Sequence, residues 1–194
     1  ILAAQCPMIY AGTGVHWSEA WAELKELAEL LGAPVTTSLG GKSSFPETHP
    51  LSMGSGGNAL PGPVHHFVQK SDLVIGIGCS FTETNFGIKF PSNKKFIHAT
   101  LDPNHLNKDV VSNVGLVGDA KLTLQALIGE LRQTIKSNRD GSKVAAEIVA
   151  VRDEWMKQWA PLLNSNDAPL NPYRVIRDLM AGVDIDNTII THDA

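Results

Sequence analysis

The sequence has few of the residues that mark several classes of protein. Its 194 residues include only two cysteines, Cys6 and Cys79, and neither lies in a Cys-x-x-Cys or Cys/His pattern, which argues against a disulfide scaffold and favours a reducing compartment. Lys and Arg number 16 and Asp and Glu 20, a formal net charge of -4, so nothing attracts a nucleic acid. No apolar run reaches the length of about 18 residues that a membrane span needs, and no charged-then-apolar signal segment precedes Ile1. We therefore expect a cytoplasmic protein without nucleic-acid or membrane partners.

Recognisable catalytic patterns are also missing. The histidines are scattered, without His-Glu-x-x-His or His-x-His spacing, and no metal site is predicted. We find no Gly-x-Ser-x-Gly sequence, no nucleophile with a base at a recognisable spacing and no pair of catalytic carboxylates. The chain is therefore not expected to supply a complete active site by itself.

The sequence does contain apolar segments typical of strands, and they alternate with amphipathic segments typical of helices. Strands are expected at 7–11, 34–38, 73–77, 94–102 and 114–117. Helices are expected over 20–31, with Ser18 as N-cap and Gly32 as C-cap, over 64–69, and from Gly118-Asp119 to Leu131. The connection over 39–63 is rich in Gly, Pro and Ser, and loops of that length are usually functional or disordered. The alternation predicts an α/β protein with a doubly wound parallel sheet.

The sequence changes character after residue 136. Residues 137–170 contain a polar break, a helix through 151–159 and an Asn, Ser and Pro-rich segment, and are interpreted as a helical linker. Asn171 then caps Pro172 at the start of a helix that ends near Ala181, and a strand is expected over 187–194. We expect a Rossmann-like domain over 1–136, the linker, and the truncated start of a further domain over 171–194. Both ends are expected to be cut, because no methionine stands at Ile1.

Two glycine turns follow predicted strands. Gly12-Thr13-Gly14 lies between a strand and a helix, where free N–H groups and the helix dipole favour phosphate. The third glycine of a Gly-x-Gly-x-x-Gly fingerprint is replaced by Trp17, and no acidic residue stands at 36–38, so a standard nicotinamide site is disfavoured. A phosphate contact and a merely tight turn both stay open. The second turn, residues 76–80, is interpreted either as close packing or as an approach of the backbone to a ligand.

Two aspartates follow later strands. Asp102 precedes Pro103 and is positioned either to accept hydrogen bonds from ribose or adenine, or to form an ordinary turn. Asp119 stands at a predicted helix start, where a carboxylate complements the helix dipole. The capping interpretation of Asp119 is the simpler one.

The order of these features resembles the central domain of thiamine diphosphate enzymes of the acetolactate synthase type. The resemblance covers residues 5–133 and depends on a combination: the first glycine turn, Gly41-Lys42, "HPL" with a following glycine, "DLVIGIG", "LDPNHLNK" and "GDA". It implies an enzyme that acts on a 2-oxo acid by decarboxylation or carboligation. It also implies that the whole enzyme binds thiamine diphosphate and Mg²⁺ and is a homodimer or homotetramer.

The resemblance further implies that this chain is a part of such an enzyme and is not catalytically competent alone. The domain with the family's catalytic glutamate would precede it, and the domain with the Gly-Asp-Gly motif would follow it. Members of the family hold FAD, an adenine nucleotide or nothing in the central domain. The positions that match such a ligand site are Gly12, Gly14, Thr37, Leu39, Gly54, Gly78, Asp102 and Asp119.

Two departures from the flavin-binding pattern count against FAD. Ser80 stands where that pattern has arginine, and Ser55-Gly56 stand where it has His-Gly. A lost arginine removes a charge-assisted phosphate contact worth on the order of 1.5 to 3 kcal/mol. FAD and ADP remain alternatives for this domain. A second hypothesis is a non-catalytic module that binds FAD, ADP or NAD, similar to the sirtuin and electron-transfer-flavoprotein relatives of the same sheet.

Overall fold

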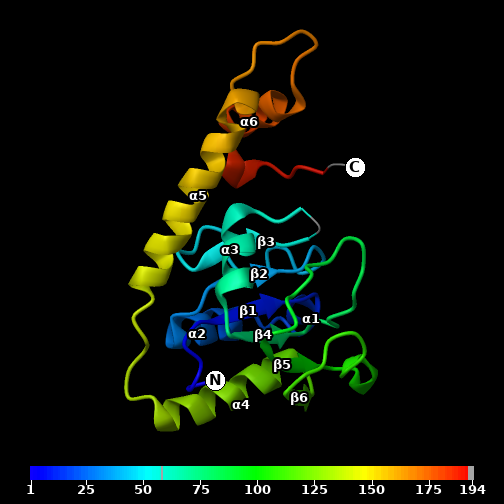
Figure 1. Cartoon of the computed structure of the whole chain (residues 1–194), viewed down its shortest axis with the longest axis vertical. Helices are drawn as coiled ribbons and strands as arrows, with labels where there is room; N and C mark the ends of the chain where they lie inside the picture. Colours follow the sequence, from blue (N-terminus) through cyan, green and yellow to red (C-terminus); the bar gives the residue numbers. More distant parts are fainter. Residues whose placement is uncertain (58, 192–194) are drawn as a thin grey trace. The chain divides into compact units, whose positions relative to one another are not determined.

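The computed structural model describes residues 1–57 and 59–191 and places six strands in one sheet. Their order is β3-β2-β1-β4-β5-β6, and every neighbouring pair is parallel. The strands are β1 (Pro7–Ala11), β2 (Val35–Thr37), β3 (Ser52–Ser55), β4 (Leu73–Ile77), β5 (Lys95–Thr100) and β6 (Val114–Val117). The helices are α1 (Gly14–Trp17), α2 (Trp21–Leu31), α3 (Gly62–Lys70), α4 (Ala120–Thr134), α5 (Ser142–Leu163) and α6 (Pro172–Gly182), with 3₁₀ turns at Pro103–His105 and Ile185–Asn187. The sheet winds outward in both directions from β1 and β4, which confirms the predicted doubly wound α/β fold (Figure 1).

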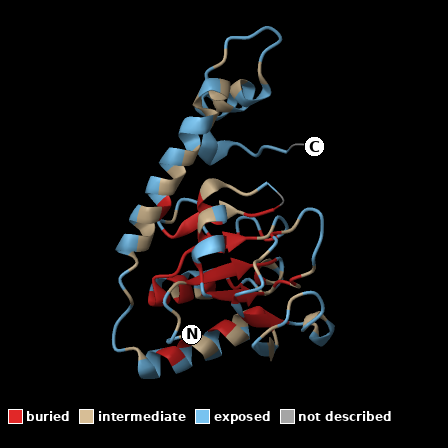
Figure 2. Ribbon diagram, viewed as in Figure 1, coloured by how far each residue is buried: buried red, intermediate tan, exposed pale blue. Residues whose placement is uncertain are grey.

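Helices cover both faces of this sheet. β1 and β4 are buried along their whole length, as the central strands of a parallel sheet are when helices lie on both sides. Because side chains alternate along a strand, Ile9 and Ile75 pack in a core cluster with α2 and α4, whereas Met8 and Val74 pack in another with α3 and with Ile148 of α5. Figure 2 shows the buried residues concentrated in the central strands.

The connection between β1 and β2, which contains α1 and α2, differs from the prediction at its start. Gly32 ends α2 in the left-handed conformation, with φ of 57°, as predicted. Ser18 does not cap α2, however, because the residue before its first turn is Ala20. Ser18 instead closes the four-residue helix α1, and its hydroxyl donates to the Gly14 carbonyl at 2.8 Å. Glu19 has a positive φ of 51°, so the backbone breaks between α1 and α2.

The long connection over 39–63 contains a strand that the sequence did not indicate. β3 pairs with β2 and forms one edge of the sheet, and the Thr36 hydroxyl donates to the Gly54 carbonyl at 2.8 Å. Its sequence, Ser-Met-Gly-Ser, has little intrinsic strand preference. Phe45 of the same connection is almost completely buried. The described residues of this connection, 39–57 and 59–63, are therefore an ordered part of the domain.

The chain divides into two compact units, Ile1–Arg152 and Asp153–Ala194. In the second unit, Asn171 caps α6 as predicted, with its Oδ1 accepting the Tyr173 N–H at 3.0 Å, and the Trp159 and Tyr173 rings lie 5.2 Å apart. The strand expected over 187–194 is not found at 188–191, and residues 192–194 lie outside the described part. A strand needs a neighbour for its N–H and C=O groups, and Ile189 is 93% exposed.

No helix of the described chain is both long enough and apolar enough to cross a membrane.

Candidate functional site

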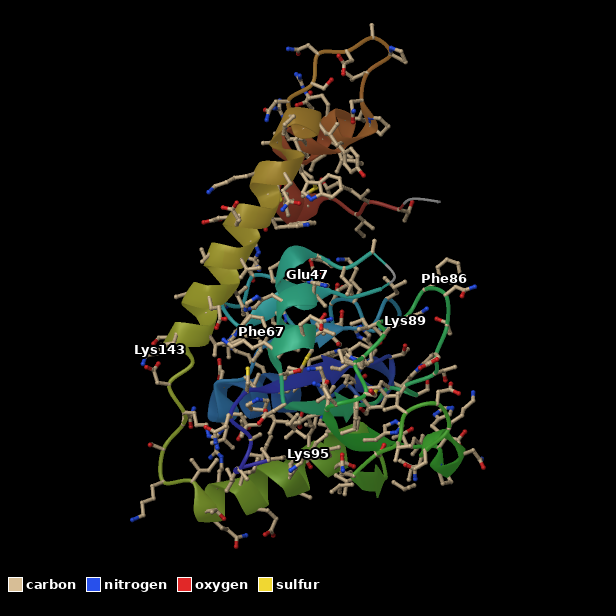
Figure 3. All side chains as sticks on the ribbon, in the orientation of Figure 1. Glu47, Phe67, Phe86, Lys89, Lys95 and Lys143 are labelled. Carbon is tan, nitrogen blue, oxygen red and sulfur yellow. The ribbon has the colours of Figure 1, made fainter. Side chains whose placement is uncertain are left out.

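A cavity of about 740 Å³ lies at the carboxyl edge of the sheet. Its walls come mainly from the segments that follow four strands: residues 12–14 after β1, 78–83 after β4, 101–103 after β5 and 118–120 after β6. Residues 87, 88 and 90 of the β4–β5 loop complete one side, and Figure 3 shows Phe86 and Lys89 on the same loop. β1 and β4 are the strands where the winding reverses, and ligands of open α/β sheets bind at this point.

The two glycine turns pack directly against each other at the base of this cavity. The Gly12 N–H donates to the Ile77 carbonyl and the Gly14 N–H to the Gly78 carbonyl, both at 2.8 Å. A Cβ added at Gly12 would lie 2.3 Å from the Gly78 oxygen, and one at Gly14 would lie 2.8 Å from the Gly78 Cα. Gly78 itself has a φ of 60°. Packing therefore accounts for all three glycines, and two of the N–H groups at the first turn are already used.

Both predicted aspartates line the cavity and accept backbone hydrogen bonds. The Asp102 Oδ1 accepts from the N–H and the side-chain amide of Asn104, each at 2.9 Å, and mainly the backbone bond holds the pKa of this carboxyl below its usual range. The Asp119 Oδ1 accepts from the N–H groups of Lys121 and Leu122 at 2.9 and 3.1 Å. Asp119 is thus the N-cap of α4, as the simpler interpretation had it.

Three of the eight predicted ligand positions do not line the cavity. Thr37 ends β2 and is buried, and its hydroxyl donates to the Oγ of Ser55 in β3 at 2.9 Å. Leu39 is 57% exposed. Gly54 lies in the edge strand β3, with a φ of 87°. The structure therefore brings Gly12, Gly14, Gly78, Asp102 and Asp119 together and leaves the other three outside.

Three aromatic side chains of the cavity were missed by the sequence analysis. Tyr10 stacks on Phe81 with a ring separation of 5.7 Å, and Phe90 meets both rings edge-on at 5.4 and 5.7 Å. Burial raises the pKa of the Tyr10 hydroxyl. A Cβ at Gly76 would lie 2.3 Å from the Phe81 ring, so that glycine makes room for the aromatic cluster. The one signal for Phe81 in the sequence was its position directly after the second glycine turn, residues 76–80.

The charges of the cavity do not suit a diphosphate. Its described lining contains the carboxylates of Glu83, Asp102 and Asp119 but no lysine or arginine. Ser80 stands at the position of the missing arginine, and its hydroxyl accepts the Thr82 N–H at 3.3 Å. The residues present therefore do not fit the diphosphate of FAD or ADP. In the described residues, no three His, Cys, Asp or Glu side chains form a cluster that suits a metal ion.

A parallel sheet with a ligand-sized cavity at its switch point defines the class of doubly wound, Rossmann-like domains. The chain belongs more specifically to the thiamine pyrophosphate enzymes, because the family model of their central domain matches residues 1–127.

Relatives and solved structures agree with this membership. The chain is 39% identical to a probable acetolactate synthase large subunit of Methanococcus aeolicus, over 100% of this chain and 34% of the relative. It is 35% identical to the corresponding protein of Methanocaldococcus jannaschii, over 100% of this chain and 33% of the relative. It thus spans about a third of the length of these relatives.

Among solved structures, the chain resembles benzoylformate decarboxylase from Polynucleobacter necessarius, with a TM-score of 0.58, 27% identity, and coverage of 72% of this chain and 26% of that one. It also resembles a putative thiamin diphosphate-dependent enzyme from Mycobacterium smegmatis, with a TM-score of 0.55, 34% identity, and coverage of 66% and 25%. These matches favour the thiamine-enzyme hypothesis over the separate nucleotide-binding module.

Proposed function

We propose that the whole protein is a thiamine diphosphate-dependent enzyme that acts on a 2-oxo acid by decarboxylation or carboligation. The observation that supports this proposal is the match of the full chain to acetolactate synthase large subunits at up to 39% identity. The chemistry would be supplied by the thiazolium of the cofactor. Thiamine diphosphate and Mg²⁺ would be held by other domains of the whole protein, since the described residues offer no metal cluster.

In this proposal the present chain supplies the non-catalytic middle of the enzyme. Residues 1–136 would form the Rossmann-like domain, 137–170 a helical linker and 171–194 the start of the cofactor-binding domain. The end of α4 at Thr134 and the Asn171 cap of α6 support these limits. Of the predicted ligand positions, we retain Gly12, Gly14, Gly78, Asp102 and Asp119 as the walls of a ligand cavity, while Thr37, Leu39 and Gly54 remain predictions without a place in it.

We further propose a cytoplasmic homodimer or homotetramer. The two free cysteines support a reducing compartment. The large number of exposed apolar side chains on the second unit, including Ile176 and Met180, supports assembly with further protein surface.

Turnover by the full-length gene product tests the proposal. The protein is incubated with thiamine diphosphate, Mg²⁺ and either pyruvate or benzoylformate, and both CO₂ release and the carboligation product are measured. We expect consumption of at least one 2-oxo acid, which stops when thiamine diphosphate is withheld, and no turnover by the 194-residue chain alone. A full-length protein that neither binds thiamine diphosphate nor consumes either acid would contradict the proposal.

A further inference from the structure

We infer that the cavity at the carboxyl edge of the sheet takes a flat aromatic ligand that carries hydroxyl groups and no phosphate, such as a nucleoside or riboflavin, and rejects ADP and FAD. This inference concerns the ligand of the proposed non-catalytic domain and to that extent rests on the proposed function.

The size and the walls of the cavity suit an aromatic ring system. A volume of about 740 Å³ lies within the range of sites for small molecules and cofactors. Tyr10, Phe81 and Phe90 form one contiguous aromatic cluster in its wall, in which Tyr10 and Phe81 are buried and Phe90 is partly exposed. Such rings offer planar apolar contact with little loss of side-chain freedom on binding. The ring of a ligand would therefore find its apolar contacts on this wall.

The positions where a phosphate would bind are closed by the protein's own groups. At the first turn, the N–H groups of Gly12 and Gly14 donate to carbonyls of the neighbouring turn. At the turn after β6, the Asp119 carboxylate accepts the N–H groups of Lys121 and Leu122 at the start of α4. A ligand phosphate takes this place at other helix N-termini, but here the protein's own carboxylate occupies it. These four N–H groups are therefore not available to a ligand anion.

The charge of the described lining also disfavours a phosphorylated ligand. Glu83, Asp102 and Asp119 are carboxylates, and the described lining has no lysine or arginine to offset them. The imidazole in the lining, His105, lies beside Asp102. The usual position for an arginine is Ser80. A diphosphate placed among these groups would meet like charges at short range in a partly desolvated site, where repulsion is screened less than in water.

One of these carboxylates is placed to recognise hydroxyl groups. The Asp102 Oδ1 is saturated by Asn104, but the Oδ2 has only a longer contact, 3.6 Å to the His105 Nε2. A carboxylate oxygen accepts hydrogen bonds and offers no donor. Vicinal hydroxyls of a ribose or ribityl chain are donors that match it.

Paired ligands test the inference in the full-length protein, with the thiamine site saturated by thiamine diphosphate and Mg²⁺ so that it does not compete. Calorimetry compares adenosine with ADP, and fluorescence compares riboflavin with FAD. We expect the unphosphorylated member of at least one pair to bind tighter by roughly tenfold or more. Equal or tighter binding of ADP or FAD, or no binding of any of the four, would overturn the inference.

Two charge variants and one control of matched bulk test whether the ligand binds in this cavity. Ser80→Arg should strengthen binding of the phosphorylated ligand by roughly 10- to 100-fold, because it restores a charge-assisted contact, whereas Ser80→Met adds similar bulk without charge and should not. Glu83→Gln changes an exposed side chain and should reduce the difference in affinity between the unphosphorylated and the phosphorylated ligand. This variant keeps the test available even if Ser80→Arg fails to fold. An unchanged preference for the unphosphorylated ligand in both charge variants would also overturn the inference.

Turnover of 2-oxo acids by the unsubstituted protein, measured in parallel, reports separately on the proposed function.

Discussion

At the scale of single residues, the carboxyl edge of the sheet depends on glycines, which have no side chain to keep the turns apart. The turns after β1 and β4 approach so closely that the Gly14 N–H bonds to the Gly78 carbonyl at 2.8 Å. The Cys79 side chain beside them is buried, and burial raises the pKa of its thiol to about 12, which favours the protonated thiol near neutral pH. Backbone packing therefore sets the shape of this edge, and the carboxylates of the cavity set its charge.

Replacing Gly12 with alanine should destabilise the domain by roughly 2 to 3 kcal/mol, because the new methyl group would overlap backbone atoms that have no room to move. The added Cβ would lie 2.3 Å from the Gly78 oxygen and 2.6 Å from the Cys79 Cα, closer than van der Waals contact allows. Urea denaturation followed by circular dichroism measures the loss. Gly129→Ala is the matched control: nothing lies within 4 Å of its Cβ in the exposed middle of α4, so it should stabilise by about 0.5 to 1 kcal/mol. Equal effects would show that the turns do not pack as described.

His98 gives the domain a predictable pH dependence. It is fully buried in β5, its Nε2 lies 2.8 Å from the Cys79 carbonyl, and desolvation lowers its pKa. The unfolded chain, with an ordinary pKa of about 6.5, therefore binds the proton more strongly than the folded one. Stability is unaffected by His98 well above that value and falls as pH drops through and below it.

We expect the difference in free energy of unfolding between wild type and His98→Gln to narrow from about pH 7.5 to about pH 5, because the uncharged variant loses no stability by this route. Denaturation curves at several pH values measure it. A difference that is constant, or that widens toward acid, would mean that His98 is not held neutral by burial.

At the scale of elements, α4 shows how one side chain sets both a helix start and the charge of the cavity. The Asp119 carboxylate accepts two N–H groups of the first turn. The same carboxylate lies in the cavity wall. Its capping role is local and needs only the sequence of α4 itself.

Asp119→Ala should therefore cost about 1 kcal/mol of stability, whereas Asp119→Asn, which keeps a capping oxygen, should stay within a few tenths of the wild type. Thermal or urea denaturation distinguishes the two. If both variants lost stability equally, the negative charge rather than the hydrogen bonds would be what holds the start of α4.

At the scale of the whole molecule, the two compact units differ in what they bury. Unit Ile1–Arg152 contains both core clusters of the sheet. In the described part of unit Asp153–Ala194 no residue is buried, and α6 exposes Val175, Ile176 and Leu179. An apolar surface of that kind is typical of an element that packs on further protein.

Hydrogen exchange of the 194-residue chain should reflect this difference. The amides of β1 and β4 should exchange at least about 100-fold more slowly than those of α6, since few buried contacts resist opening of α6. In the full-length protein, α6 should gain protection while the central strands change little. Protection of α6 in the 194-residue chain equal to that of β4 would contradict this description of the second unit.

The sequence by itself determined the elements whose signals are local. The apolar runs of β1, β4 and β5, the left-handed Gly32 and the caps Asp119 and Asn171 all appear where the residue pattern placed them, because strand burial and capping depend on neighbours along the chain.

Only the tertiary structure decided the features that depend on contacts between distant segments. β3 is a strand because β2 lies beside it and not because Ser-Met-Gly-Ser favours one, and α1 is separate from α2 because Glu19 takes a positive φ. The cavity gathers Tyr10, Phe81 and three carboxylates from four segments and excludes Thr37 and Leu39. A sequence pattern orders side chains along the chain, whereas a site is defined by which of them fold to the same edge, and that requires the packed sheet.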